Sequence, residues 1–587
     1  MAVHYKNIIA NELIRKALGE VVASKKLKSG LHSEVFKLIK TLPVKRQSEG
    51  SPQFGIKTTD LSHHFQENVK IPETVGEGIV SNEVEDSVYF RIDPVSFAQT
   101  VLKSVRADGS NYGHRDTHQP PQCVCVEFSS PNIAKPFHVG HMRSTIIGNV
   151  MSNLYEAAGH DVKRANFLGD WGTQFGLLML GLQRYSQRKR VKADPLQEFF
   201  EVYVKINKDV KEESGERPES SSQTYQEGMS LFSKLEKGDP DLRSVWQEVR
   251  ELSIAELDKM YQRLGVHFSH IMPESCFQDK TSEVLQCLRD ASLLQFDSNG
   301  VGYVNVNIQE NMGKANVVKS DGSSLYLTRD IAAALERETM FACDRMHYVV
   351  EMGQRSHFVK LVSVLNQLGV PWAQRPIDEI HIRFGRVKGM STRSGNVVFL
   401  RDILDEARER VAHSMRDRPT TRVSGTLDAV ADTLAVSAII LQDLKSHRAN
   451  DYSFSWERML SFKADSGIFA QYCHSRLCSM MNSCGVEAAD ADVDLDSIAE
   501  DVALHRIVLH LARFPEVFET SLSSLEPHHI VQYLYRLCHL INAAYSTCPV
   551  KGQPTDVAQA RLSVFAGAKQ VLANCLQLLG LPLVDKM

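Results

Sequence analysis

The sequence has no apolar run long enough to cross a membrane, since its hydrophobic stretches stay short of the roughly 20 residues that a bilayer requires. It has no Cys-x-x-Cys pair either, because its 11 cysteines are scattered along the chain. This spacing argues against a zinc site and gives no support to a disulfide framework, so free thiols in a reducing compartment are expected. The net charge is only −4. It neither favours nor excludes a nucleic-acid partner, because a basic face can lie within a nearly neutral protein.

What the sequence does have is length and an ordinary globular composition. A chain of 587 residues with 43% hydrophobic and 24% charged residues is too long for one core and is expected to form three or four soluble domains. Its beginning is basic, because residues 1–46 hold ten lysines and arginines against three acids. Such a segment suits a mitochondrial transit peptide and equally a basic helix that contacts RNA phosphate, and both interpretations stay open.

One segment, 128–141, carries the strongest functional signal. It reads FSSPNIAKPFHVGH and follows an apolar run, Cys123–Phe128, that is typical of a buried strand. Apolar residues then recur at helical spacing until Gly159, a residue type that commonly ends a helix. The two histidines and Gly140 therefore lie at a strand-to-helix junction, where free backbone N–H groups and the helix dipole favour phosphate. A His-x-Gly-His loop there suits an enzyme that uses the α-phosphate of ATP, although two histidines three apart also arise by chance.

The longer pattern resembles the signature segments of class I aminoacyl-tRNA synthetases, and specifically of arginyl-tRNA synthetases. In that family Ser-Pro-Asn and a lysine precede the His-x-Gly-His motif, as they do within 130–141 here. Further blocks follow in the family's order: NFLGDWGTQFG at 166–176, SDGS and YLTRD within 320–330, Gln354 with His357-Phe358, and Asp451-Tyr452. The resemblance covers the chain from about residue 120 onward. It implies ATP-dependent activation of L-arginine and transfer to the 3′ end of tRNA-Arg.

The expected fold is multidomain α/β with a Rossmann-like parallel-sheet catalytic domain at 119–402, which contains a mainly helical insertion at about 187–300. Residues 1–118 should form a small α/β N-terminal domain, which the resemblance places on the D-loop side of the tRNA. Residues 403–587 lose their strand signals, which predicts an all-α anticodon-binding bundle. The predicted sheet strands are Cys123–Phe128, Lys163–Phe167, Met346–Val350 and Ile380–Phe384. The predicted bundle helices are Leu434–Leu444, Ser466–Met481, Leu504–Phe514, Ile530–Tyr545 and Val557–Leu579.

Four shorter predictions complete this outline. Val88–Ile92 alternates like a strand, and Phe97–Val105 reads as a helix. The turn-rich stretch 107–121 is a candidate linker, and the polar segment 212–223 is a candidate mobile loop inside the insertion.

An arginine pocket needs carboxylates, because a planar guanidinium with five donors is best met by paired, charge-assisted hydrogen bonds. Asp330 and Tyr326 are four residues apart and can face one point from a single helical turn; the alternative for Asp330 is a surface pair with Arg329. The resemblance implies an arginine site made of Glu127, Ser130, Pro131, Asn132, His141, Tyr326, Asp330 and Gln354. It implies an ATP site made of His138, Gly140, His141, Met390 and Ser391. Mg²⁺ is expected to be carried by the phosphates of ATP, so no metal-binding residue is predicted.

The second class I motif departs from the class pattern. The segment equivalent to Lys-Met-Ser-Lys-Ser reads GMSTRSG at 389–395, so both lysines are absent. Arginyl enzymes often lack the second lysine, and the resemblance implies that Lys135, just before the His-x-Gly-His motif, replaces it. Arg393 is a second candidate, and the sequence does not choose between them. With His138, Gly140 and His141 they make up the predicted catalytic set.

Polar and aromatic residues of the C-terminal part are candidates for RNA contact, although each one taken alone favours a structural role slightly. They are Gln471, Tyr472, His474, Arg476, Tyr545 and the terminal Met587. The expected partners are tRNA-Arg, L-arginine and ATP, with no membrane, for a monomer in the mitochondrial matrix or, alternatively, the cytoplasm. The rival readings are another class I synthetase, an ATP-dependent nucleotidyltransferase with the same loop, and a catalytically inactive RNA-binding paralogue.

Overall fold

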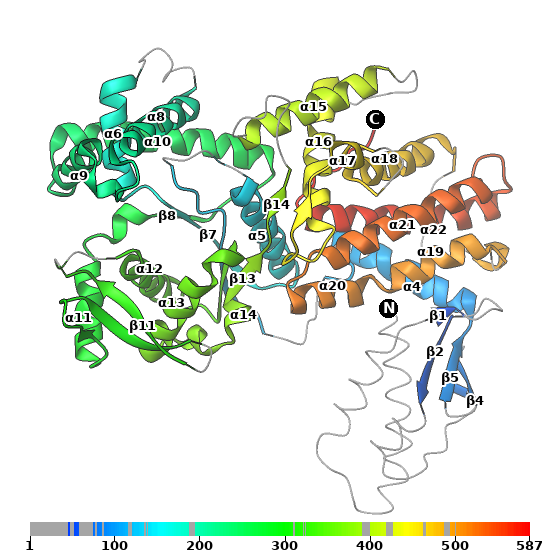
Figure 1. Cartoon of the computed structure of the whole chain (residues 1–587). Coiled ribbons are helices and arrows are strands. Elements are labelled where there is room, and N and C mark those ends of the chain that lie inside the picture. The colour runs from blue at the N-terminus through cyan, green and yellow to red at the C-terminus, as the bar shows by residue number, and fades with distance from the viewer. Residues whose placement is uncertain are drawn as a thin grey trace, which may run out of the picture.

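The computed structural model describes most of the chain, and Figure 1 shows how its parts are arranged. The described residues are 45–46, 52–57, 74–76, 79–84, 87–114, 120–133, 137, 139–186, 194–308, 311–320, 322, 325–389, 399–417, 426–461, 465–486, 494–498 and 500–587. Apart from two residues, the basic segment 1–46 lies outside this set. Across the described ranges, no helix is both long and apolar enough to span a membrane.

A five-stranded parallel sheet forms the centre of the catalytic region, with the strand order β13-β12-β6-β7-β8. Its strands are β6 (Cys123–Glu127), β7 (Asp161–Leu168), β8 (His270–Pro273), β12 (Arg345–Glu351) and β13 (His381–Phe384). The four strands predicted from the sequence are confirmed. The interior of β6 is buried on both faces, as expected for a parallel strand covered by helices.

For the insertion at 187–300, one strand was missed and one prediction is wrong. The edge strand β8 lies inside the predicted mainly helical segment; its Ile271 is exposed and it ends at Pro273, so its sequence shows no buried apolar run. The polar stretch at 212–223 is not a free loop: Glu213 near the end of α8 (Pro195–Ser214) accepts hydrogen bonds from Ser222 Oγ at 2.6 Å and from the Thr224 backbone N–H at 2.9 Å. These side-chain bonds tie the end of one helix to the start of the next.

The rest of the insertion is mainly helical, as predicted, and it ends with the first strand of a small sheet. Besides α8, its helices are α9 (Gln223–Glu236), α10 (Pro240–Arg263) and α11 (Thr281–Asp290), and α6 (Thr173–Tyr185) lies just before it. A Cβ added at Gly176 would lie 2.0 Å from the Gly228 carbonyl oxygen, so α6 and α9 can pack this closely only with glycine there. The antiparallel sheet consists of β9 (Gln295–Phe296), β10 (Gly302–Ile308) and β11 (Asn311–Val318).

Four more helices and two short strands belong to the catalytic region. They are α5 (Val139–Ala157), α12 (Tyr326–Phe341), α13 (Arg355–Gln367), α14 (Ile377–Ile380), β14 (Val387–Lys388) and β15 (Tyr452–Ser453). α5 joins β6 to β7 and ends before Gly159, which has a φ of 87°. That left-handed conformation suits glycine, and it confirms the predicted helix end.

The N-terminal region combines an antiparallel sheet with one helix. The sheet has the order β1-β2-β5-β4-β3, and its strands are β1 (Lys45–Arg46), β2 (Pro52–Lys57), β3 (Thr74–Gly76), β4 (Ile79–Val84) and β5 (Ser87–Ile92). The helix is α4 (Pro94–Asp108), whose first turn is capped by Asp93 accepting from the Ser96 N–H at 2.7 Å. The strand and the helix predicted in this region are confirmed.

α4 packs against the C-terminal bundle, so the N-terminal and C-terminal regions share a core. The Tyr112 ring stacks on Phe514 with centroids 6.3 Å apart, and its hydroxyl donates to the Leu511 carbonyl at 3.1 Å. Asn574 donates to the Gly109 carbonyl at 3.0 Å. The predicted linker at 107–121 is therefore wrong in its first part, because these contacts hold it against the bundle.

The C-terminal region is helical, as predicted, and all five predicted helices are confirmed. Its helices are α15 (Leu400–Arg416), α16 (Leu427–Leu444), α17 (Trp456–Met459), α18 (Gly467–Ser483), α19 (Val502–Ala512), α20 (Phe514–Ser524), α21 (His528–Thr547) and α22 (Thr555–Leu578). The predicted boundary at 402/403 falls inside α15. That helix begins with only Phe399 at its N-cap and no capping side chain, so the sequence gives little signal of its start.

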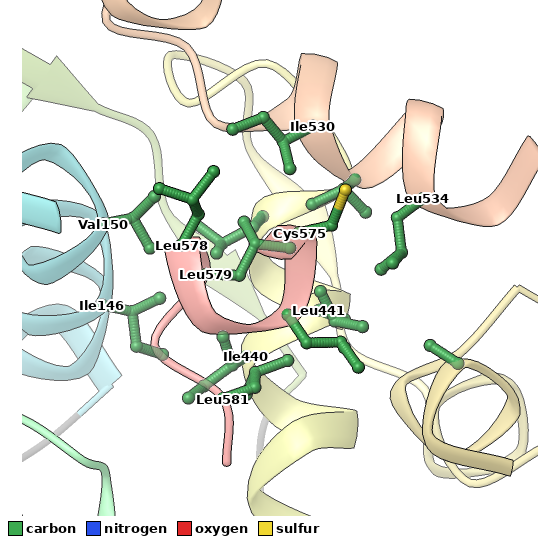
Figure 2. Close-up of a cluster of buried hydrophobic side chains, with 14 of the residues drawn as sticks. Ile146, Val150, Ile440, Leu441, Ile530, Leu534, Cys575, Leu578, Leu579 and Leu581 are labelled. Atoms are coloured by element: carbon green, nitrogen blue, oxygen red, sulfur yellow. The ribbon is translucent and has the colours of Figure 1, made fainter. Parts of the chain in front are cut away.

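α5 also packs against this bundle. Figure 2 shows Ile146 and Val150 of α5 facing Leu578, Leu579 and Leu581 at the end of α22. Arg143 of α5 and Asp443 of α16 form an ion pair at 2.9 Å, and their side chains are 1% and 0% exposed. The helix that follows the signature segment is thus fixed between the parallel sheet and the bundle (Figure 1).

Candidate active site

The chain turns sharply where β6 ends. Ser129 and Ser130 have φ values of 69° and 43°, in the left-handed region that residues other than glycine rarely adopt. Surrounding contacts hold this turn: the Ser129 N–H donates to Ser144 Oγ at 2.9 Å, and Ser129 Oγ lies 2.8 Å from the Tyr261 hydroxyl. Ser130 Oγ in turn donates to Glu127 Oε1 at 3.2 Å. Such strained turns are typical of functional sites, where the surroundings fix the side-chain positions.

A cavity of about 430 Å³ lies beside this turn, at the carboxyl ends of the central strands. Six of the predicted site residues line it together: Glu127, Ser130, Gly140, His141, Asp330 and Gln354. Ligands of open parallel sheets commonly bind at this edge. The structure therefore brings the predicted carboxylates and the start of α5 into one hollow.

The first turns of α5 form one wall of the cavity through Gly140, His141 and Ser144. The His141 ring is half-buried and packs on Phe137, with centroids 5.4 Å apart. The amino end of a helix carries N–H groups without intrahelical acceptors and the positive end of the helix dipole. This wall suits the phosphate groups of a nucleotide.

Glu127 and Arg337 form a buried ion pair at the base of the cavity. Arg337 Nη2 lies 2.7 Å from Glu127 Oε2, and both side chains are almost completely buried. Burial raises the pKa of the Glu127 carboxyl, and the Arg337 charge opposes that shift. Sequence reasoning missed Arg337. The available signal was its position seven residues after Asp330, on the same face of α12.

Asp330 does not pair with Arg329 on the helix surface, so that alternative is wrong. Arg329 points the other way and lies 2.8 Å from Glu274. The Asp330 carboxylate instead meets His357 of α13, with Nε2 2.6 Å from Oδ2. Both residues line the cavity.

The expectation that Tyr326 and Asp330 face the same point is wrong. Tyr326 is the first residue of α12; its side chain is 54% exposed, and the Arg329 guanidinium covers its ring at 4.8 Å. It is absent from the cavity lining, because it lies one helical turn further out than Asp330. Pro131 and Asn132 lie next to the cavity wall without lining it; Asn132 forms a backbone bridge with Gly169.

Comparison with known proteins agrees with this arrangement. A family model described as "tRNA synthetases class I (R), catalytic domain" matches residues 101–456, and one described as "DALR anticodon binding domain" matches 470–587. The probable mitochondrial arginine–tRNA ligase of Bos taurus is 38% identical over 94% of this chain and 96% of its own length. The chain belongs to the class I arginyl-tRNA synthetase family.

Other members of the arginyl-tRNA synthetase family come from both compartments. The mitochondrial arginine–tRNA ligase of Saccharomyces cerevisiae is 40% identical, over 85% of this chain and 77% of its own length. The cytoplasmic enzyme of that yeast is 37% identical, over 85% of this chain and 82% of its own. The arginyl-tRNA synthetase structure from Thermus thermophilus has a TM-score of 0.75 at 19% identity, over 93% of this chain and 96% of that one. At that identity the structural likeness shows the fold alone.

Five predicted residues of the synthetase site lie outside the described residues, namely Lys135, His138, Met390, Ser391 and Arg393. The strand that leads to the second class I motif is described. Lys388 of β14 lies 3.0 Å from the Asp451 carboxylate, which also accepts from the Arg386 N–H at 2.7 Å. Asp451, which belongs to one of the family blocks, therefore fixes β14 just before the second class I motif.

The predicted RNA-contacting residues of the DALR domain fall into two groups, one exposed and one buried. Tyr472 and Arg476 lie one turn apart on α18; Tyr472 is 42% exposed, and the Arg476 guanidinium lies 3.7 Å from the Tyr545 ring centroid. This arrangement offers a surface on which an unpaired base can stack.

Gln471 and His474 face the opposite side of α18, and direct RNA contact by them is a wrong prediction because both are buried. Gln471 is 0% exposed; its amide donates to the Pro582 carbonyl at 2.7 Å and accepts from the Val584 N–H at 3.1 Å. His474 Nδ1 lies 3.1 Å from the Val584 carbonyl. Together with the Met587 N–H, which donates to Ser475 Oγ at 3.0 Å, these bonds attach the C-terminal tail to α18.

Among the described residues, the fold creates one cluster of Cys, His and acidic side chains that the sequence spacing did not suggest. His474, Cys478 and Asp585 place one ligand atom each within 4.8 Å of one another. Cys478 Sγ donates to Asp585 Oδ1 at 3.6 Å, so the cluster is accounted for as part of the tail attachment. All 11 cysteines are free thiols.

Proposed function

We propose that this chain is an arginine–tRNA ligase that activates L-arginine with ATP and transfers it to the 3′ end of tRNA-Arg. The observation that supports this best is the meeting of Asp330 with the start of α5 in a single cavity. One side of that hollow suits a guanidinium and the other suits phosphate. Family membership supports the same reaction.

In this reaction the α-carboxylate of arginine attacks the α-phosphorus of ATP, giving arginyl-adenylate and pyrophosphate. Asp330 would receive the guanidinium, while Asn132, His138 and Gln354 would hold the α-amino and α-carboxylate groups, with Ser130 beside them. Gly140 and His141 at the first turn of α5 would contact the phosphates. The protein accelerates the step mainly by alignment and electrostatic stabilisation.

Mg²⁺ would enter on the β- and γ-phosphates of ATP rather than on protein carboxylates. The acids of the cavity are consistent with this, because each already has a cationic or donor partner. Glu127 pairs with Arg337, Asp330 with His357, and Glu351 with Arg386. In the second step the terminal ribose hydroxyl of the tRNA attacks the activated carbonyl.

For the tRNA, we place the D-loop side on the domain at 1–118 and the anticodon on the bundle at 403–587. Tyr472, Arg476, Tyr545 and Met587 would contact unpaired bases. The protein would act as a monomer. A mitochondrial location rests on the basic segment 1–46 and on mitochondrial relatives, with the cytoplasm as the alternative. A fluorescent reporter fused to residues 1–46 tests it, and a diffuse cytosolic signal would contradict it.

Pyrophosphate exchange with each of the twenty amino acids, with and without tRNA, tests the reaction. We expect exchange with arginine and with no other amino acid, and we expect it to appear only when tRNA-Arg is added. Preference for another amino acid would favour a different class I synthetase. Exchange without any amino acid would favour a nucleotidyltransferase, and no exchange under any condition would favour an inactive RNA-binding paralogue.

A further inference from the structure

The two acids at the base of the cavity differ in how they are held. Both carboxylate oxygens of Glu127 have a partner: Oε1 accepts from Ser130 Oγ at 3.2 Å, and Oε2 lies 2.7 Å from Arg337. Arg337 is a permanent cation because guanidinium groups stay protonated in proteins. The charge of Glu127 is therefore balanced within the protein before any substrate arrives.

Asp330 is held from one side only in the described part of the chain. Its Oδ2 lies 2.6 Å from His357 Nε2, and both side chains keep a little under a third of their surface exposed. An ionised carboxylate can only accept hydrogen bonds, so Nε2–H of His357 is the donor. His357 is the third residue of α13, whose first residue follows Gln354 of η4 (Met352–Gln354), and its ring packs edge-on to Phe358 at 5.5 Å. These contacts fix the direction of that donor.

We infer that His357 is a positioning residue for substrate specificity, holding the Asp330 carboxylate in the plane that a guanidinium requires. This inference rests on the proposed arginine activation. With Oδ2 held by His357, Oδ1 remains for an N–H of the substrate. His357 itself touches the carboxylate and not the reacting phosphorus, so it acts through Asp330 on arginine binding and leaves the chemical step alone.

The binding of arginine and the binding of lysine should depend differently on His357. A guanidinium is planar and presents its donors in a fixed fork, so its hydrogen bonds to a carboxylate depend on the orientation of that carboxylate. The ammonium of lysine is a compact charge with three rotatable donors and does not need a defined plane. Loss of His357 should therefore weaken arginine binding more than it weakens lysine binding, which is weak in the wild type as well.

The test compares wild type with His357→Ala, His357→Leu and His357→Gln in arginine-dependent pyrophosphate exchange with tRNA present. Loss of a hydrogen bond to a charged group predicts that Ala and Leu raise the arginine KM by about 10- to 100-fold. We expect kcat and the ATP KM to change by less than about threefold, because the nucleotide wall is untouched. A glutamine side chain can place its Nε2 close to the position of His357 Nε2, so His357→Gln should recover most of the lost arginine affinity. The inhibition constant of lysine should change by less than about threefold.

A matched control is His539→Gln, because His539 makes the same kind of contact, 2.7 Å to Asp465, on the distant helix α21. It should leave every constant unchanged. An unchanged arginine KM in both His357→Ala and His357→Leu would overturn the inference, and so would an equal loss for lysine or a failure of Gln to recover binding. If the wild type itself shows no exchange with arginine, the proposed function fails instead, and the two failures are thereby distinguished.

Discussion

Asp330 carries the charge that a guanidinium would meet in the cavity, because Glu127 is already paired with Arg337. Asp330→Asn keeps the shape of the side chain and removes that charge. We expect kcat/KM for arginine to fall by about 100- to 1,000-fold, because the guanidinium would lose its charged partner. The ATP KM should change little. Pyrophosphate exchange measures both constants, and a variant with wild-type kcat/KM would show that another group recognises arginine.

Lys135 is the proposed replacement for the missing lysine of the second motif. We expect Lys135→Ala to lower the rate of arginine activation at least 100-fold, equivalent to roughly 3 kcal/mol, with little change in arginine binding. Arg393→Ala is the matched comparison, since it is the other candidate. Single-turnover formation of arginyl-adenylate measures the step directly. An unaltered rate in Lys135→Ala together with a slow Arg393→Ala would transfer the role to Arg393.

Glu274 should make thermal stability depend on pH. Burial raises its pKa from 4.5 to about 7, although Arg329 lies 2.8 Å away. Because the folded-state pKa is raised, this group stabilises the fold fully below pH about 4.5, and that contribution is lost as the pH rises through 7. Glu274→Gln cannot titrate, so its Tm relative to wild type should rise by about 2–5 °C between pH 5 and pH 8. A Tm difference that is the same at both pH values would contradict this.

Sequence reasoning found the residues that carry a motif and missed those that support them. His141, Asp330 and Gln354 line the cavity because they belong to segments with recognisable patterns. Arg337 was missed because its partner Glu127 lies on a strand far away in the sequence, although its place seven residues after Asp330 was an available signal. His357 was noted as part of a family block, but its contact with Asp330 on another helix was not predicted. Gln471 shows the reverse error, because a glutamine on an amphipathic helix gives no sign that its amide binds the C-terminal tail.

At the level of elements, segments with a clear apolar pattern were predictable. The five bundle helices have long apolar patterns, and the four predicted strands are mainly buried. β8 has four residues, as β13 does, but its Ile271 is exposed at the edge of the sheet, and it takes its place there from pairing with β7. The polar stretch after α8 is ordered by side-chain bonds to Glu213, and polarity alone cannot distinguish that from a free loop.

The contact between α16 and α18 depends on a glycine. A Cβ at Gly467 would lie 2.2 Å from the backbone carbon and oxygen of Ser437, so the two helices would have to separate. We expect Gly467→Ala to lower the Tm by several degrees and to weaken tRNA binding, because α18 carries Tyr472 and Arg476. Thermal unfolding and tRNA titration measure the two effects. Ser479→Ala, exposed on the same helix, is the control, and an equally small change in both variants would contradict the close-contact explanation.

Across the whole molecule, α5 is the element that connects the cavity to the helical bundle. Its first turn lines the cavity, and its later residues pack on α22, as Figure 2 shows for Ile146 and Val150. The buried pair of Arg143 and Asp443 joins the same helix to α16. The packing of the bundle and the position of this cavity wall therefore depend on the same helix.

Breaking the pair between Arg143 and Asp443 tests how much it stabilises the packing of α5 on α16. Asp443→Leu leaves Arg143 buried without its partner, which should cost about 3–5 kcal/mol and lower the Tm clearly. The double variant Arg143→Met with Asp443→Leu removes both charges and should recover part of that loss. Thermal unfolding of the three proteins measures it. Equal loss in the single and double variants would mean that the unpaired charge is not the cause.

The most direct measurement is the affinity of arginyl-sulfamoyl-adenosine, a stable mimic of arginyl-adenylate, by calorimetry. If Asp330 and the start of α5 form one site, this ligand should bind at least about 1,000-fold more tightly than arginine or adenosine alone. Asp330→Asn should weaken it by at least about 10-fold, and the lysyl analogue should bind at least about 100-fold more weakly. Binding no tighter than arginine alone, or equally tight binding of the lysyl analogue, would contradict a single cavity built for both groups.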